Sequence, residues 1–171
     1  MTANSCSNKD LLTIEHRSWN MSRIRSKDTV PEKIARSVLR GLGYRFRLHV
    51  QLQFKPERRH WKVTSTKNPL TTRRVSVDIL LPRYKTAIFV HGCFWHRHKG
   101  CGNCTTPTHR KDWWLTKLEG NVARDQKNQN ALKKLGWRTL VVWECQTKNQ
   151  NDIEKLRARL DNSLGNLNQR E

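Results

Sequence analysis

Apolar and polar positions follow two different periods along the chain, which indicates both helices and strands. Between Pro31 and Gly43, apolar residues recur at helical spacing, so a helix is expected that begins at the proline and ends at the glycine. Residues 44–50 alternate apolar and basic side chains, the pattern of a half-buried strand. Residues 75–82 and 85–92 are more continuously apolar and predict two strands joined by a tight turn, the second buried on both faces.

The second half of the chain continues this exchange of helix and strand. Residues 112–135 have helical spacing, in one segment or in two divided at Gly120. Residues 137–144 predict another buried strand, and residues 151–165 a closing helix. This order predicts an α/β domain whose mixed sheet is flanked by helices. A chain of 171 residues has room for one such domain, expected at 21–165.

Three segments fall outside this pattern. Residues 1–20 lack periodicity and are expected to form a mobile N-terminal arm, and residues 166–171 a tail. Residues 51–74 interrupt the domain as a basic insertion with seven Lys and Arg, one Glu and two Pro. A loop of this length is usually functional or disordered. The sequence leaves open whether it contacts DNA phosphates or only decorates the fold.

The charge of the chain indicates a polyanionic partner. The 34 Lys and Arg against 14 Asp and Glu give a formal net charge of +20, which favours nucleic acid and, second, an acidic membrane surface. No stretch approaches the roughly 18 apolar residues of a membrane span, and no apolar N-terminal segment predicts a signal peptide. An intracellular, cytoplasmic protein is therefore expected. Its five cysteines would stay reduced, which favours metal binding over disulfides.

The string FVHGCFWHRHKGC, residues 89–101, is the densest in reactive side chains. A structural zinc ion takes four thiolate and imidazole ligands. The ligands expected here are Cys93, His98, Cys101 and either Cys145 or Cys104. Cys145 would tie this loop to the end of a distant strand, although a free cysteine is often simply buried.

Two histidines of this string, His91 and His96, remain for other chemistry, and imidazole can act as a general acid or base near neutral pH. Asp78 interrupts an apolar strand, where a carboxylate needs either a structural partner or a function. The tight turn between the strands can bring Asp78 beside His91 and the main-chain carbonyl of Val90. Such oxygen ligands suit Mg²⁺, which can polarise a phosphate and generate a hydroxide.

Several strings between Asn20 and Cys145, outside residues 51–74, resemble the very short patch repair (Vsr) endonucleases. They are MSRIRSKDT, PEK, VDILLP, FVHGCFWHRH, WWLTKLEGNVARDQ and LGWRTLVVWEC, in this order. The resemblance implies a type II restriction endonuclease-like core with a structural zinc site. It also implies Mg²⁺-dependent nicking of one strand of double-stranded DNA next to a T:G mismatch, left by deamination of 5-methylcytosine.

The resemblance further implies roles for single residues. Its active-site residues are Asp78 and the Val90 carbonyl as Mg²⁺ ligands, His91 beside the scissile phosphate, His96 as general base, and Glu32 as a further acidic group. Its zinc ligands are Cys93, His98, Cys101 and Cys145. Its DNA contacts are Met21 in the minor groove, the wedge aromatics Phe94, Trp95 and Trp114, and Lys117 and Asn121 at the mismatched pair. It implies a monomer, associated with the nucleoid and linked in function to a cytosine-5 DNA methyltransferase.

Three departures from the family pattern keep alternatives open. Val77 stands where the family usually has proline, Gly100 adds a residue between His98 and Cys101, and the insertion precedes Asp78. One alternative is a related nuclease that recognises another mismatch or cleaves both strands. The other is a zinc-stabilised DNA-binding module without catalysis.

Overall fold

The computed structural model describes residues 27–54 and 73–165, together with residues 13, 16, 19, 22 and 23. Met21, most of the expected N-terminal arm, residues 55–72 of the expected insertion and the expected tail therefore lie outside the described residues.

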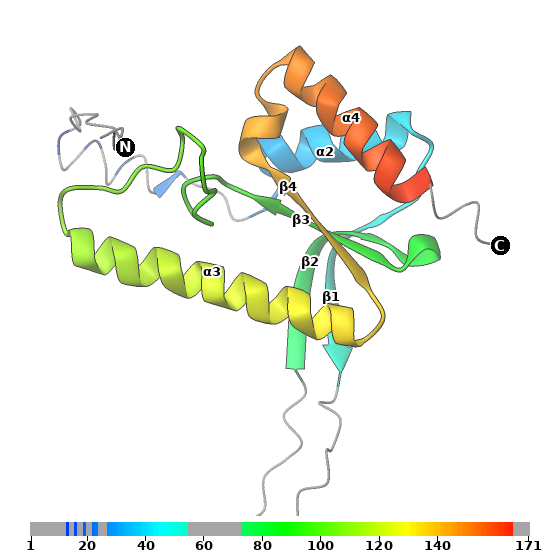
Figure 1. Cartoon of the computed structure of the whole chain (residues 1–171), viewed down its shortest axis with the longest axis horizontal. Coiled ribbons are helices and arrows are strands. Elements are labelled where there is room, and N and C mark those ends of the chain that lie inside the picture. Colours follow the sequence, from blue (N-terminus) through cyan, green and yellow to red (C-terminus); the bar gives the residue numbers. More distant parts are fainter. Residues whose placement is uncertain are drawn as a thin grey trace, which may run out of the picture.

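The described part of the chain forms a four-stranded mixed sheet with three α-helices, so the expected α/β class and mixed sheet are confirmed (Figure 1). The elements are α2 (Val30–Gly41), β1 (Arg47–Phe54), β2 (Arg73–Leu81), β3 (Thr86–His91), α3 (Lys111–Lys134), β4 (Arg138–Trp143) and α4 (Gln150–Gly165), with short 3₁₀ turns η1 (Pro82–Tyr84) and η2 (Glu144–Thr147). None of the helices in these ranges is long and apolar enough to cross a membrane.

The strand order places the ends of two strands side by side. The order is β1-β2-β3-β4, with β1–β2 and β2–β3 antiparallel and β3–β4 parallel. In this parallel pair His91 lies opposite Trp143. The loop after β3 and the turn after β4 therefore leave the sheet at the same edge, where the expected chemistry is concentrated.

Helices cover both faces of the sheet (Figure 1). On one face α2 and α4 pack on a core that includes Leu39, Ile88 and Leu160. On the other face α3 contributes Leu132 to a second core with Phe89. Successive residues of β3 alternate between these two cores, so this strand is buried on both faces, as its apolar sequence predicted.

The first hairpin differs from its predicted bounds: β1 ends at Phe54 and β2 begins at Arg73, so residues 51–54 and 73–74 of the expected insertion are strand. The first strand begins at Arg47, not at residue 44, because Tyr44 closes α2 with a hydrogen bond to the Leu39 carbonyl and its side chain is buried in the first core. Of the two alternatives for residues 112–135, the single segment is confirmed, because α3 continues through Gly120 without a break. Glycine disfavours a helix by about 1 kcal/mol relative to alanine, which the packing of a 24-residue helix easily offsets.

The β1–β2 hairpin changes its packing at one point, the pair of His49 and Asp78. These two residues are absent from an otherwise continuous register, and His49 has φ +48°. Before Asp78, Val77 packs in the second core, whereas Ile79 after it packs in the first. Since alternate residues of a regular strand share one face, the sheet is twisted locally at this pair.

Candidate active site and metal centre

The loop after β3 brings His91 and His96 together. Their rings stack, with centroids 3.9 Å apart and planes 9° apart. His91 is the last residue of β3 and is 5% exposed, whereas His96 is half-buried. Burial, together with the charge of His96, lowers the pKa of His91 to about 4. His91 is therefore neutral near pH 7 and can hydrogen-bond an incoming group without adding charge.

One face of α3 supports this loop. Trp114, Leu118, Asn121 and Asp125 recur at helical spacing. Asp125 contacts His96 Nδ1 directly, and the Asn121 amide donates a hydrogen bond to the Trp95 carbonyl over 3.1 Å. A carboxylate on one imidazole nitrogen fixes the tautomer and leaves the other nitrogen free to accept a proton. Asp125 was not predicted, although its spacing from Trp114 and Asn121 could have signalled it.

Asp78 lies in β2, the strand between β1 and β3, and is half-buried. Its Oδ2 accepts a hydrogen bond from the Val90 main-chain N–H over 2.8 Å, so the two residues are neighbours, and the expected role of the Val90 carbonyl as a metal ligand stays a prediction. Burial raises the pKa of Asp78, and this hydrogen bond opposes the rise. A nearby cation would favour the ionised form. Within the described ranges, Oδ1 has no hydrogen-bond partner and is available to such an ion.

Glu32, expected in the active site, is committed to a buried network. Its Oε2 accepts hydrogen bonds from Arg36 Nη2 over 2.8 Å and from the Asp28 N–H over 3.1 Å, while Oε1 accepts from the Thr29 hydroxyl. Arg36 also reaches Asp28 Oδ1 at 2.6 Å and His49 Nε2 at 3.0 Å. The Glu32 carboxylate thus holds Arg36, and through it His49, beside the active site.

Four side chains from two distant segments form a candidate metal centre. The ligand atoms of Cys93, His98, Cys101 and Cys145 all lie within 4.8 Å of one another. His98 Nδ1 is 3.6 Å from Cys93 Sγ and 3.4 Å from Cys145 Sγ. Tetrahedral coordination with ordinary zinc bond lengths puts a nitrogen and a sulfur ligand about 3.6 Å apart. The two distances from His98 match tetrahedral coordination, and the four side chains could hold one metal ion.

Neighbouring groups keep this metal centre in place. The His98 ring stacks on Trp143, with centroids 4.1 Å apart, and Glu144 Oε2 accepts the Cys93 N–H over 3.2 Å. The additional residue Gly100 has φ +74°, in the left-handed region that glycine adopts without strain. Burial raises the pKa of the Cys93 thiol to about 12, so this sulfur needs a bound cation to become a thiolate. Cys104 is not part of the four-residue group.

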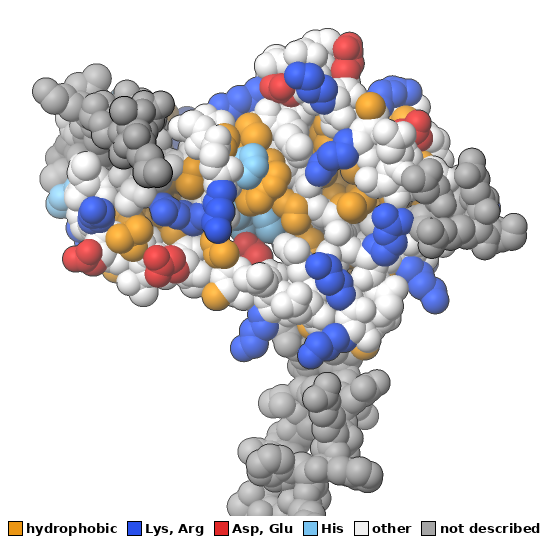
Figure 2. Space-filling view, viewed as in Figure 1, with side chains coloured by type: hydrophobic (Ala, Val, Ile, Leu, Met, Phe, Trp, Pro, Cys, Tyr) orange, Lys and Arg blue, Asp and Glu red, His pale blue; other side chains and the backbone are white. Residues whose placement is uncertain are grey.

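The expected wedge aromatics form one cluster between the loop and α3. Phe94 contacts Trp95 and Trp114 edge to face, with centroids 5.1 and 5.4 Å apart. Lys117 Nζ lies over this cluster, 5.9 Å from the centroid of the Trp95 ring and 6.0 Å from that of Trp114. Figure 2 shows histidines and hydrophobic side chains together on this face, with Lys and Arg side chains around them. Such a surface offers flat rings and positive charge to nucleic acid bases and phosphates.

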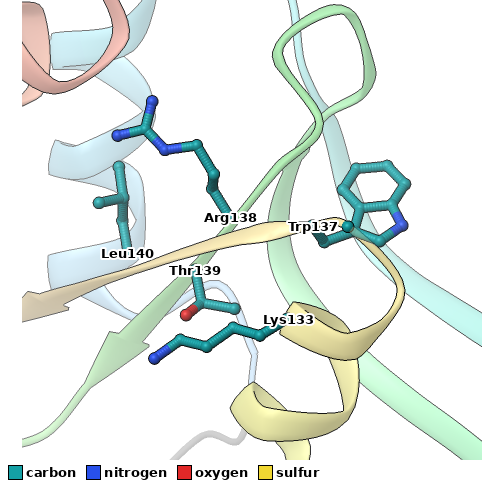
Figure 3. A pocket seen from close by; sticks show the side chains of 6 residues that line it. Lys133, Trp137, Arg138, Thr139 and Leu140 are labelled. Atoms are coloured by element: carbon teal, nitrogen blue, oxygen red, sulfur yellow. The ribbon is translucent and has the colours of Figure 1, made fainter.

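A surface pocket of about 420 Å³ lies elsewhere, where α3 ends and β4 begins. In Figure 3, Lys133 and Thr139 point to one side of β4, whereas Arg138 and Leu140 point to the other. Arg138 pairs with Thr86 at the start of β3, five residues or about 17 Å along the sheet from His91. The pocket is therefore separate from the histidine site.

Known proteins match the chain over most of its length. The model of the family "DNA mismatch endonuclease Vsr" matches residues 9–58 and 73–102. The type II nicking enzyme V.XorIIP of Xanthomonas oryzae is 42% identical over 155 residues, which cover 91% of this chain and 96% of the relative. The chain belongs to the Vsr family.

Two further Vsr relatives support this assignment and its class, the nucleases. The DNA mismatch endonuclease Vsr of Escherichia coli is 37% identical over 148 residues, covering 85% of this chain and 81% of the relative. The type II nicking enzyme V.NmeAIP of Neisseria meningitidis is 38% identical over 141 residues, covering 82% and 86%. The Vsr model leaves out residues 59–72, which fall within the expected basic insertion. The residues matched include Asp78, His91 and His96.

Proposed function

We propose that the chain is a Mg²⁺-dependent endonuclease that nicks one strand of double-stranded DNA next to a T:G mismatch. The observation that supports it best is the convergence of Asp78, the stacked pair His91 and His96, and Asp125 at one edge of the sheet, on a nuclease of the Vsr family. We infer that the core is of the type II restriction endonuclease kind.

Asp78 and the Val90 carbonyl would hold Mg²⁺, which supplies positive charge that polarises the scissile phosphate. His96, oriented by Asp125 at Nδ1, takes a proton from the attacking water at Nε2. His91, neutral and stacked on His96, would donate a hydrogen bond to a phosphate oxygen. His96 is therefore the proton acceptor of the pair, because the lowered pKa of His91 makes that ring the weaker base.

The candidate metal centre would hold the active site in place, and the aromatic cluster would open the DNA. We infer that Cys93, His98, Cys101 and Cys145 bind a structural zinc ion, because their spacing and chemistry fit tetrahedral coordination. Phe94, Trp95 and Trp114 would enter the base stack, which is easier at a mismatch because the pair is already weak. Lys117 and Asn121 would approach the mismatched pair. The Asn121 amide would have to do so while bonded to Trp95.

The biological role follows from the substrate. A T:G pair arises when 5-methylcytosine is deaminated, so the protein would act where a cytosine-5 DNA methyltransferase modifies the same DNA. We infer a monomer that works on the nucleoid. The formal charge of +20 supports tight and salt-sensitive binding to the DNA backbone.

A nicking assay on end-labelled duplexes tests this function. The duplexes differ in a single pair, which is T:G, T:A, C:G or A:C, and each strand is labelled in turn. We expect a nick only in the T-containing strand of the T:G duplex. The nick should appear with Mg²⁺ and be absent with EDTA. Nicking of the T:A or C:G duplex at the same rate, or cleavage of both strands, would instead support a nuclease with another specificity.

A further inference from the structure

We propose that His49 donates a hydrogen bond from Nδ1 to a phosphate oxygen of the DNA strand bound beside Asp78. The inference rests on the proposed DNA cleavage and adds a substrate-binding residue to the same site. It starts from the one residue pair that interrupts the β1–β2 register, His49 and Asp78. The charge of His49 is close enough to influence the ionisation of Asp78.

The backbone at His49 is unusual for a strand. A non-glycine residue with positive φ is uncommon, and such residues cluster at functional sites. At His49 the value is +48°, although residues 48 and 50 on either side pair regularly with β2. The twist that this conformation imposes turns the hairpin between the two cores and sets the histidine beside the catalytic carboxylate.

The contacts of Nε2 determine which nitrogen carries the proton. His49 Nε2 lies 3.0 Å from Arg36 Nη2 and 3.4 Å from Asp28 Oδ1. Arginine only donates hydrogen bonds, so in the neutral ring Nε2 accepts and the proton is on Nδ1. In the charged ring both nitrogens carry protons. Nδ1–H is therefore a donor in either state, and it has no hydrogen-bond partner among the residues that the structure describes.

A phosphate oxygen fits this donor better than a metal ion fits the cluster. The ligand atoms of Asp28, Glu32 and His49 lie within 4.8 Å of one another, which is also the pattern of a cation site. The buried guanidinium of Arg36 already occupies that position, with ion pairs of 2.6 Å to Asp28 and 2.8 Å to Glu32. The His49 side chain is 23% exposed, so a ligand can reach the ring. Phosphate oxygens are the acceptors that a DNA backbone presents most often.

Two substitutions separate this role from a structural one. Asparagine places an amide N–H near the position of Nδ1, whereas glutamine places its amide near Nε2, against Arg36. We expect His49→Asn to keep the affinity of wild type for a T:G duplex, measured by fluorescence anisotropy in EDTA. His49→Gln should weaken binding on the order of tenfold, the loss expected for one hydrogen bond to a charged group. The single-turnover nicking rate at subsaturating enzyme should follow the same order.

The opposite result, with His49→Gln like wild type and His49→Asn weakened, would overturn the inference, because His49 would then serve Arg36 alone. Equal affinities in wild type and both variants, or equal losses in both, would also overturn it. Thermal unfolding identifies a variant that does not fold. In that case, a series of duplexes is used instead, each with one neutral methylphosphonate at a different position near the nick. At one position the methylphosphonate should weaken binding of wild type but not of His49→Ala.

The binding assay also separates this inference from the proposed function. If wild type binds the duplex and shows the expected contrast between the two variants but never nicks T:G DNA, the phosphate contact stands and the proposed reaction fails. If wild type nicks and the contrast is missing, the reaction stands and the role of His49 fails.

Discussion

His91 and His96 stack face to face, 3.9 Å between ring centroids, although one ends a strand and the other lies in the loop that follows. Asp125 from α3 contacts His96. The ring of Trp143 packs edge to face against His91, with centroids 5.4 Å apart. Trp143 also stacks on His98 of the candidate metal centre. The metal centre and the histidine pair are therefore packed as one unit.

Substitution of Asp125 should lower the rate of nicking and leave the affinity for DNA almost unchanged. Asp125→Asn removes the charge that holds the tautomer of His96, so we expect the single-turnover nicking rate to fall at least about 10- to 100-fold, the range seen for groups that orient metal-binding histidines. The affinity for the T:G duplex should stay within a few-fold of wild type. Glu119→Gln, which removes a charge from an exposed position of the same helix, is the matched control. Equal rates in the two variants would remove Asp125 from the mechanism.

Cys145, and not Cys104, should be required for the metal centre. Cys145→Ser removes one of four converging ligands, so we expect the purified protein to lose most of its zinc and its melting temperature to fall. Cys104→Ser should retain about one zinc per chain. Elemental analysis and a thermal unfolding curve measure both effects. Zinc retained in Cys145→Ser but lost in Cys104→Ser would reverse the assignment.

Replacing either of two glycines by alanine should change the stability of the protein, in opposite directions at the two positions. At Gly120 in α3 no atom lies within 4 Å of an added Cβ, so Gly120→Ala should raise the free energy of unfolding by about 0.5–1 kcal/mol. Gly100 also has open space but φ +74°, so Gly100→Ala should destabilise the loop by about 1 kcal/mol through backbone strain. Chemical denaturation measures both changes, and a stabilised Gly100→Ala would contradict the loop conformation.

The ion pair of Asp28 and Arg36 should make stability depend on pH. The hydrogen bond from Arg36, and then that from His49, lowers the pKa of Asp28 below its ordinary value of 3.8. A lowered pKa means that the stabilisation is complete above pH 3.8 and disappears as the pH falls through the folded-state value. Wild type should therefore exceed Asp28→Asn in free energy of unfolding at pH 6, and the difference should shrink below pH 3.8. A difference that is constant from pH 6 to pH 3 would contradict this role.

The sequence predicted the parts of the site that lie close together in the chain. Asp78 and Val90 are joined by a tight turn, and the cysteines and histidines of residues 91–101 lie in one loop, so local spacing brings them near one another. The α/β class and most element positions followed from periodicity. The strand after α2 was misplaced because Tyr44 and Phe46, read as alternating strand residues, pack into the first core before β-pairing begins.

The parts that the sequence did not predict depend on contacts between distant segments. Asp125 is 29 residues from His96, and no local spacing links α3 to the loop that carries His96. His49 and Arg36 appeared as an alternating strand position and a helix surface position, yet Arg36 is 8% exposed and paired with Glu32 and Asp28. Glu32 and Arg36 lie one helical turn apart in α2, but the contact of Arg36 with His49 joins this helix to β1 and has no sequence period.

The central claim is that Asp78 works with the histidine pair to nick DNA at a T:G mismatch. The most direct test measures nicking of an end-labelled T:G duplex by wild type, by Asp78→Asn and by the control Asp152→Asn, which changes a carboxylate at the start of α4. All three proteins are first matched for zinc content and for affinity to the duplex. We expect a nick beside the mismatched T with wild type and Asp152→Asn, and about a thousandfold loss with Asp78→Asn, because a bound metal supplies several kcal/mol of transition-state stabilisation. Undiminished nicking by Asp78→Asn would contradict this claim.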